Sequence, residues 1–399
     1  MSADALRRTS AAGLPLVERI AARTLERVLA GIEGGTLEVR LPHGRELRFG
    51  SGPAVTMTIE DTRLFRRLAT QPRLGLGESY QAGEWRSDDL PALLELLARN
   101  ADRGAARHPF LGRLARARPR VNRRTGLLAA RRNIRYHYDL GNDFFALFLD
   151  GTMTYSCAVI EHEDEPLAHA QRRKLRMVCD KLELGPDDHV LEIGCGWGSF
   201  ALTAAGEYGA RVTGITLSPA QAELARRRIA AAGLADRIEI RLQDFRELEG
   251  TFTKVASIEM IEAIGERLLP TFFETIDRVL APGGRACIQS ILIPDERYRR
   301  YRSSPDWIER HIFPGCLIPS LGALTAASGR LRIRDVEHIG RHYGETLARW
   351  RAAFDAKRAA VHDLGFDERF IRTWDFYLAS CEALFRAGLL DDAQLVVTR

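Results

Sequence analysis

The stretch HVLEIGCGWGSFA, residues 189–201, places three glycines directly after an apolar strand pattern and before a predicted helix. The glycines are Gly194, Gly196 and Gly198. A glycine-rich turn lets a ligand approach the backbone closely, and the N-terminus of the following helix favours negative charge. The sequence therefore predicts a ligand-binding loop at the end of this strand.

The spacing of the glycines distinguishes between ligands. It is not G-x-G-x-x-G, which is typical of dinucleotide binding. Instead, Glu192 precedes the first glycine in the E-x-G-x-G-x-G form that is usual for S-adenosylmethionine methyltransferases. The second strand ends in GITLSPAQ, without a strong acid for a ribose, so we expect Thr216, Ser218 and Gln221 to make those polar contacts. A purely structural turn and an NAD site are the weaker alternatives.

The pattern around this loop predicts an α/β fold. From about residue 188 onward, strand-like runs alternate with helical segments, which is typical of a doubly wound, mostly parallel sheet. The chain after Tyr343 is rich in aromatic residues and is predicted to be helical. The predicted strands cover residues 189–195, 210–218, 237–244, 255–261 and 283–293.

The N-terminal part has a different pattern and is predicted to be a small α+β unit. Residues 35–50 alternate apolar and polar side chains about a Pro-His-Gly turn, which predicts a hairpin. Helical spacing is found on both sides of it. We predict an N-terminal, lipid- or substrate-associated domain over residues 1–100, an arginine-rich linker over 101–130 and a catalytic domain over 131–399.

Composition indicates a globular protein with reduced thiols. Of 399 residues, 45% are hydrophobic and 28% are charged. There is no apolar run long enough to span a bilayer and no pattern typical of a secretory signal, and the six cysteines are scattered without a CxxC pair. We therefore expect a cytoplasmic protein. No metal site is predicted.

Positive charge is concentrated in one segment. Residues 101–135 hold eleven arginines against one acid, Asp102, whereas the whole chain has a net charge of +5. Such a segment is either a solvated linker or a patch that binds an anionic surface, such as lipid headgroups or nucleic acid. Because Phe110 is the segment's one aromatic residue for base stacking, nucleic acid is the least favoured partner.

Several motifs, taken in order and spacing, resemble the cyclopropane-fatty-acyl-phospholipid synthase family. The resemblance covers roughly residues 130–399 and implies a class I methyltransferase domain with a Rossmann-like fold. Residues 75–90 also look like the N-terminal domain of the longer members that act on phospholipids. The motifs are YHYDLGNDFFALFLDGTMTYSCAV (136–159), VLEIGCGWGSFA (190–201), GITLSPAQ (214–221), IEMIEAIG (258–265) and IFPGCLIPSL (312–321).

This resemblance implies a specific chemistry. Members of the family transfer the methyl group of S-adenosylmethionine to the double bond of an unsaturated acyl chain, which leaves a carbocation. A base must then remove a proton to close a cyclopropane ring, and in the family this base is understood to be a bound bicarbonate ion. By motif matching, the bicarbonate site falls on Cys157, Glu262, Gln289, the backbone of Ile291, and Tyr343.

The resemblance also places a cofactor-facing segment before the glycine loop. It implies that Tyr138, Gly141, Tyr155 and Ser156 face S-adenosylmethionine. Beyond the third strand of the sheet, where such enzymes contact the adenine, stand Gln243 and Asp244. Nothing in this chemistry requires a covalent thiolate, so Cys157 is interpreted as a wall of the anion site.

One position departs from the family pattern. Better-known members have a His-Thr-Ile triplet where this chain has Gln289-Ser290-Ile291. An amide donates a hydrogen bond but cannot become cationic. A different course of proton loss would give a methylene branch, which a partner reductase could convert to a methyl branch. Cyclopropane is favoured over branching; a lipid-binding module with a decayed site is the alternative from another class.

The substrate implies a membrane surface. An acyl chain within a phospholipid does not diffuse freely to an enzyme in solution, so we expect the protein to be peripheral on the inner face of the membrane. Each basic residue near an anionic leaflet contributes about 1 kcal/mol, which suits residues 101–135. Residues 307–321 are predicted to form an apolar mouth for the chain. A homodimer is compatible with the sequence.

Overall fold

The computed structural model describes residues 23, 26, 29–107 and 140–399, with the exception of 43, 72 and 304. The described residues fall into two compact units. Unit 1 takes its residues from Met1–Pro119 and Gly365–Ala387, and unit 2 takes its residues from Arg120–Leu364 and Gly388–Arg399. Most of the arginine-rich segment, residues 108–135, lies outside the described residues.

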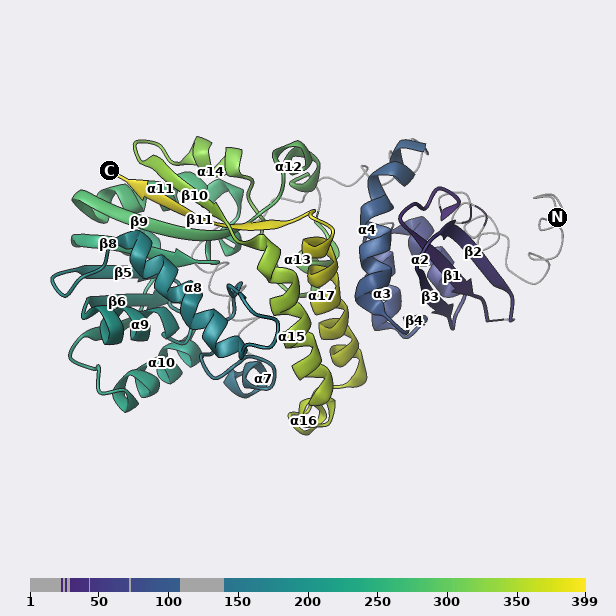
Figure 1. Cartoon of the computed structure of the whole chain (residues 1–399), viewed down its shortest axis with the longest axis horizontal. Coiled ribbons are helices and arrows are strands. Elements are labelled where there is room, and N and C mark those ends of the chain that lie inside the picture. The colour runs from purple at the N-terminus through teal and green to yellow at the C-terminus, as the bar shows by residue number, and fades with distance from the viewer. Residues whose placement is uncertain are drawn as a thin grey trace. The chain divides into compact units, whose positions relative to one another are not determined.

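Unit 2 contains a sheet of seven strands within the described part of the chain (Figure 1). Its strands are β5 (His189–Ile193), β6 (Arg211–Thr216), β7 (Ile238–Leu242), β8 (Phe252–Ile258), β9 (Leu280–Leu292), β10 (Arg332–His338) and β11 (Asp391–Thr398).

The strand order confirms the predicted doubly wound α/β fold. The order is β10-β11-β9-β8-β5-β6-β7, and the five strands from β9 to β7 are parallel. The chain proceeds from β5 outward through β6 to β7 and then returns to place β8 on the other side of β5. In such sheets ligands bind beyond the carboxyl ends of the strands where the order reverses, which here is the end of β5 and β8.

The C-terminal tail corrects one prediction. It is helical as far as Arg386, but Asp391–Thr398 forms β11, which lies antiparallel between β9 and β10. β10 was not predicted either. Because β11 runs opposite to β9, its first residues lie beside the last residues of β9, with Asp392 opposite Ile291 and Gln394 opposite Gln289.

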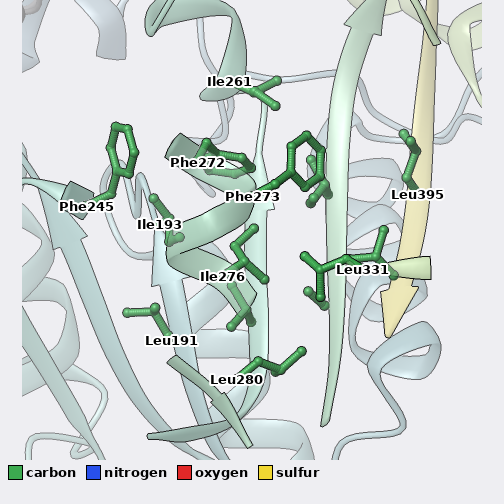
Figure 2. Close-up of a cluster of buried hydrophobic side chains, with 14 of the residues drawn as sticks. Leu191, Ile193, Phe245, Ile261, Phe272, Phe273, Ile276, Leu280, Leu331 and Leu395 are labelled. Atoms are coloured by element: carbon green, nitrogen blue, oxygen red, sulfur yellow. The ribbon is translucent and has the colours of Figure 1, made fainter. Parts of the chain in front are cut away.

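Helices cover both faces of this sheet, and the strands are buried on both sides. In β5, Val190 packs with α8, α9 and α10, whereas Leu191 and Ile193 pack on the other face with α11 and α14. Figure 2 shows the cluster on this second face, where side chains of the sheet and of α11 pack together. The helices of unit 2 are α7 (Asn142–Ala146), α8 (Leu167–Leu182), α9 (Ser199–Tyr208), α10 (Pro219–Ala231), α11 (Leu269–Val279), α12 (Asp295–Tyr301), α13 (Trp307–His311), α14 (Leu321–Ala327), α15 (Tyr343–Ala356) and α16 (Arg358–Asp363), with short 3₁₀ helices η2 (Phe245–Glu247), η3 (Ile261–Ala263), η4 (Glu266–Leu268) and η5 (Gly340–His342).

Unit 1 is a small α+β unit, as expected for the N-terminal part. The predicted hairpin is present, since β1 and β2 pair antiparallel, and the sheet order is β2-β1-β3-β4. Its elements are β1 (Gly35–Arg40), β2 (Glu46–Ser51), β3 (Ala54–Ile59), β4 (Trp85–Ser87), α2 (Arg63–Thr70), α3 (Gly75–Gln81), α4 (Leu90–Arg107) and α17 (Glu368–Arg386).

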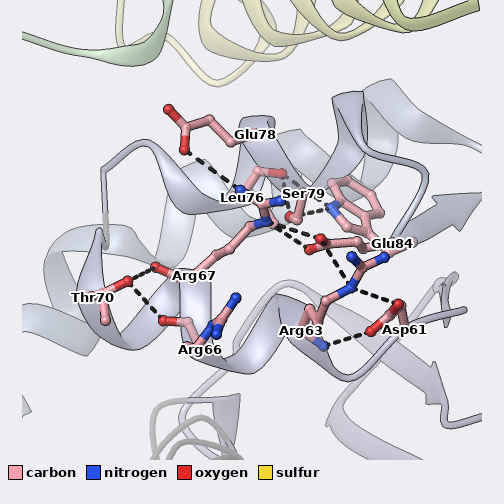
Figure 3. A network of polar contacts seen from close by, with 10 residues as sticks. Asp61, Arg63, Arg66, Arg67, Thr70, Leu76, Glu78, Ser79 and Glu84 are labelled. Carbon is pink, nitrogen blue, oxygen red and sulfur yellow. Dashed lines mark hydrogen bonds and ion pairs between the residues drawn. The ribbon is translucent and has the colours of Figure 1, made fainter.

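The helix α17 comes from the end of the chain, whereas the sequence placed all of 131–399 in one catalytic domain. It packs on α3 and α4 of unit 1. The hydroxyl of Tyr80 donates to a carboxylate oxygen of Asp375 at 2.5 Å, and the guanidinium of Arg372 lies 4.2 Å from the centre of the Tyr80 ring. An ion-pair network around the buried Glu84 joins α2 to the segment before β4 (Figure 3).

In the part of the chain that the structure describes, no helix is both long enough and apolar enough to cross a membrane.

Candidate active site

The glycine loop leaves β5 in a conformation that requires glycine. Gly194, Gly196 and Gly198 have φ values of +85°, +50° and +83°, in the left-handed region that side chains disfavour. A Cβ atom at Gly194 would lie 2.5 Å from Cγ of Met260. A Cβ atom at Gly196 would meet no heavy atom within 4 Å. The loop is therefore packed tightly against the end of β8 at one glycine and open at the next.

The polar residues predicted after β6 lie together at the same edge. Oγ1 of Thr216 donates to Oε1 of Gln221 at 2.8 Å, and the backbone N–H of Ser218 donates to Oγ1 of Thr216 at 3.1 Å. Ser218 also caps α10, because its hydroxyl oxygen accepts from the backbone N–H of Gln221 at 3.3 Å. All three side chains are buried.

The residues after β7 lie one strand further out. Nε2 of Gln243 donates to the backbone carbonyl of Glu247 at 2.9 Å. Asp244 caps η2 and forms a 2.8 Å ion pair with Arg246. Both residues thus stand beyond the carboxyl end of the sheet, where the sequence placed the adenine contact.

The segment that precedes the glycine loop in sequence is tied to it. Gly141 stands at the N-cap of α7 with a φ of +86°, and Asn142 accepts a 2.7 Å hydrogen bond from the indole N–H of Trp197 in the loop. The ring of Tyr155 lies 5.4 Å from that of Phe145, centre to centre. The structure therefore places Gly141 and Tyr155 at or beside α7, the helix that is bonded to the glycine loop. Tyr138 lies outside the described residues.

A carboxylate that the sequence did not single out lies at the centre of the predicted anion site. Glu259 follows β8 directly and has a φ of +47°. Its Oε1 accepts from the backbone N–H of Cys157 at 2.7 Å and from Nε2 of Gln289 at 2.9 Å. Its Oε2 accepts from the hydroxyl of Tyr343 at 2.5 Å. Three of the five residues predicted to bind bicarbonate therefore donate hydrogen bonds to a single carboxylate of the protein itself.

The other two predicted residues meet each other nearby. Oε1 of Glu262 accepts from the backbone N–H of Ile291 at 2.6 Å and from the hydroxyl of Ser290 at 3.0 Å. Oε2 of Glu262 is buried and has no hydrogen-bond partner among the described residues. Burial, and then the negative charge of Glu259, raise the pKa of Glu262 to about 8. This carboxyl is therefore largely protonated at neutral pH.

A third acid and a buried cation complete the cluster. Asp392, at the start of β11, is fully buried and accepts from Nε2 of Gln289 at 2.8 Å. Lys174 of α8 is also fully buried, and its ammonium donates to the hydroxyl of Ser156 at 2.5 Å. Burial raises the pKa of Glu259 and, more strongly, that of Asp392, and the charge of Lys174 opposes both shifts. We call Glu259, Glu262, Asp392, Lys174 and Gln289 the carboxylate cluster.

The thiol of Cys157 is not arranged as a nucleophile. It is fully buried and its Sγ lies 3.2 Å from the carbonyl oxygen of Ala158 and 3.7 Å from that of Ile339, both acceptors. Burial, and then the charges of Asp392 and Glu259, raise the pKa of this thiol well above its usual value. A thiol that stays protonated is a poor nucleophile, and the contact it makes with the cluster is through its backbone N–H.

Sequence reasoning missed Glu259, Lys174 and Asp392. Glu259 was expected inside a strand over 255–261, but β8 ends at Ile258. Lys174 carried a weak signal, because it is one of only four lysines in an arginine-rich chain and stands in an otherwise amphipathic helix. Asp392 had no signal, because the strand that it begins was not predicted.

Comparisons with known proteins agree on one family. The profile of the family described as Mycolic acid cyclopropane synthetase matches residues 127–395. The chain is 43% identical over 351 residues to "Tuberculostearic acid methyltransferase UfaA1" of Mycobacterium tuberculosis, covering 84% of this chain and 81% of the relative. It is 34% identical over 351 residues to "Cyclopropane-fatty-acyl-phospholipid synthase" of Escherichia coli, covering 88% and 89%.

A solved structure gives the same answer. The mycolic acid cyclopropane synthase CmaA1, in a crystal structure of its complex with SAH and CTAB, is 30% identical with a TM-score of 0.63. The match covers 67% of this chain and 98% of that protein. The resemblance drawn from the motifs is thereby confirmed, and so is the class I methyltransferase fold.

Proposed function

This chain belongs to the mycolic acid cyclopropane synthetase family, and from that premise we propose that it methylates the double bond of an unsaturated fatty-acyl chain of a phospholipid. S-adenosylmethionine, when bound, supplies an electrophilic sulfonium methyl group. Its proposed binding residues are those at the glycine loop and after β6 and β7, together with Gly141, Tyr155 and Ser156. The open space at Gly196 suits a ligand that approaches the backbone.

The observation that carries this proposal is the contact between the two halves of the site. Met260, the neighbour of Glu259, packs so closely on Gly194 that a Cβ atom there would lie 2.5 Å from its side chain. The glycine loop and the carboxylate cluster therefore adjoin at the switch point of the sheet. Carboxylates beside the transferred methyl would stabilise a carbocation and accept a proton from it.

Two candidate functions share the methyl transfer and differ in the product that forms from the carbocation. After methyl transfer, the cation lies on the neighbouring chain carbon. Loss of a proton from the new methyl, with its C–H electrons closing onto the cation, gives cyclopropane. A 1,2-hydride shift first moves the cation to the methylated carbon, and the same proton loss then gives a methylene branch, with a double bond between the chain carbon and the transferred carbon. Neither route needs an added oxidant or reductant.

We propose that the methylene branch is the product and that a partner reductase converts it to a methyl branch. The support is the higher identity to the tuberculostearic acid methyltransferase, 43% against 34% for the cyclopropane synthase over equal lengths. Gln289, which stays neutral, stands where better-known members have a histidine, and this agrees with a different course of proton loss from the carbocation. Cyclopropane, favoured by the sequence alone, remains the second candidate because of the 34% identity.

Lipid analysis after expression in a host that lacks cyclopropane and branched fatty acids tests this function. We expect a monounsaturated acyl chain to gain one methylene unit in mass. Ozonolysis then separates the candidates, because a methylene branch is cleaved to a ketone on the acyl chain whereas a cyclopropane is not. An unchanged fatty-acid profile in the presence of soluble, cofactor-binding protein would contradict the proposal.

We further propose that the arginine-rich segment, residues 101–135, binds anionic lipid and brings the enzyme to its substrate. Vesicle co-sedimentation tests this point. Binding should be stronger to anionic than to neutral vesicles and should weaken as salt is raised. Equal binding to both kinds of vesicle would contradict it.

A further inference from the structure

The hydrogen-bond donors expected for bicarbonate are already used by Glu259. Its two carboxylate oxygens accept from the N–H of Cys157 at 2.7 Å, from Nε2 of Gln289 at 2.9 Å and from the hydroxyl of Tyr343 at 2.5 Å. A carboxylate and a bicarbonate ion present the same planar pair of acceptor oxygens. The fourth expected donor, the N–H of Ile291, is held by Glu262 at 2.6 Å.

Charge also disfavours an added anion. Glu259 lies close enough to Asp392 and Glu262 for its charge to raise the pKa of both carboxyl groups. The charge of Lys174 lowers the pKa of Glu259 and of Asp392, against the effect of their burial. A bicarbonate ion here would place a second negative charge beside the carboxylate of Glu259, whose charge Lys174 already offsets. Bicarbonate therefore does not fit this site.

The backbone at Glu259 points to a purpose for this side chain. Its φ of +47° is in the left-handed region, which glycine adopts readily and glutamate does not. The conformation is held by its own N–H, which donates to the carbonyl of Gln289 at 2.9 Å. A residue kept in a disfavoured conformation by its surroundings is typical of functional sites.

We propose that the carboxylate of Glu259 replaces bicarbonate as the base of the reaction. This inference rests on the proposed function. The carboxylate takes a proton from the transferred methyl group, and the C–H electron pair forms the new carbon–carbon bond of either product. The proton ends on Glu259 and leaves to solvent before the next turnover. Cys157, Gln289 and Tyr343 orient the carboxylate, so they act through Glu259.

The test compares the wild-type protein with Glu259→Gln and Glu259→Gly in a buffer freed of carbon dioxide. The substrates are S-adenosylmethionine and vesicles of dioleoylphosphatidylglycerol, and bicarbonate is then titrated into each reaction. Calorimetric binding of S-adenosylmethionine shows that each variant is folded. Glycine is the informative replacement, because it suits a φ of +47° and leaves both the space and the donors for a small anion.

We expect the wild-type rate to be the same within about twofold with and without bicarbonate. Both variants should lose about a hundredfold or more, which is the usual contribution of a general base. Added bicarbonate or acetate should restore Glu259→Gly at least tenfold and leave Glu259→Gln unchanged, because the amide still fills the space.

The failures are distinguishable. A wild-type enzyme that methylates lipid only when bicarbonate is present overturns the inference and leaves the proposed function standing; this arm needs no variant. A Glu259→Gln protein with wild-type turnover does the same. A wild-type protein that methylates no lipid at any bicarbonate concentration overturns the proposed function and the inference with it.

Discussion

Two glutamates, one in each unit, are held in opposite ways. In unit 1, the side chain of Glu84 is fully buried and both of its carboxylate oxygens lie 3.0 Å from Nε of Arg67, with Nε of Arg63 at 3.8 Å (Figure 3). In unit 2, Glu259 has neutral donors on both oxygens and shares its surroundings with other acids.

These surroundings suit a structural role for the carboxylate of Glu84 and a role as a base for the carboxylate of Glu259. Arginine pairing offsets the cost of burying the charge of Glu84 and joins α2 to the segment before β4. Neutral donors orient Glu259 without neutralising it, and burial raises its pKa, which makes it a stronger base.

Removal of the buried cation should have the largest effect. Lys174→Met leaves Glu259 and Asp392 without the charge that favours their ionised forms. We expect a loss of about 3 kcal/mol or more in the free energy of unfolding and a loss of lipid methylation of about a hundredfold. Chemical denaturation and a methylation assay measure the two effects. The matched control is Lys357→Met at an exposed lysine; equal losses in both variants would contradict the prediction.

Glu84→Gln should affect stability and not chemistry. The change leaves the guanidinium of Arg67 beside an amide, and we expect it to cost about 1–3 kcal/mol in unfolding free energy. The methylation rate of the folded, cofactor-saturated protein should stay within about twofold of wild type. As a control, Glu60→Gln breaks an exposed ion pair with Arg86 and should cost about 1 kcal/mol or less. A large fall in turnover of folded Glu84→Gln would remove the distinction between the two glutamates.

Glu262 should make stability depend on pH. Its pKa in the folded state is about 8 against an ordinary value of 4.5, so the folded state binds more protons between these values. The unfolding free energy therefore falls as pH rises from about 5 to about 8. Glu262→Gln should remove part of this fall, measured as Tm across the range, whereas Glu296→Gln at an exposed position should not. An unchanged pH dependence in Glu262→Gln would show that this carboxyl ionises normally.

The smallest effect is expected for Cys157→Ser. The thiol lies against the carbonyls of Ala158 and Ile339, while the backbone N–H that binds Glu259 is unchanged by the substitution. We expect turnover to fall by less than about tenfold, because a hydroxyl can donate to the same carbonyls. Cys381→Ser in unit 1 provides a matched thiol control. A folded, cofactor-binding Cys157→Ser protein without activity would show that the thiol itself takes part in the chemistry.

Much of the fold follows from local sequence signals. Three features each specify their own backbone conformation: the glycines after β5, the N-cap Ser218 with Pro219 at the start of α10, and the hairpin turn between β1 and β2. By contrast, β11 follows two long helices and pairs with β9 far earlier in the chain. No local pattern shows where such a strand inserts.

The site was predictable only in part for the same reason. The motifs located Cys157, Gln289 and Tyr343 through a family resemblance, but not the group on which they converge. That convergence depends on β8 ending at Ile258 and on the left-handed turn of Glu259. These features arise from three strands meeting at one edge, and a single stretch of sequence does not encode them.

The most direct test of the account is the fate of a deuterated methyl group. Purified protein is given S-adenosylmethionine with a trideuterated methyl group and vesicles of dioleoylphosphatidylglycerol, and the acyl chains are analysed by mass spectrometry. We expect a carbon-methylated chain that keeps two of the three deuterium atoms, because the base removes one. Retention of all three, or label that is absent from the acyl chain, would contradict it.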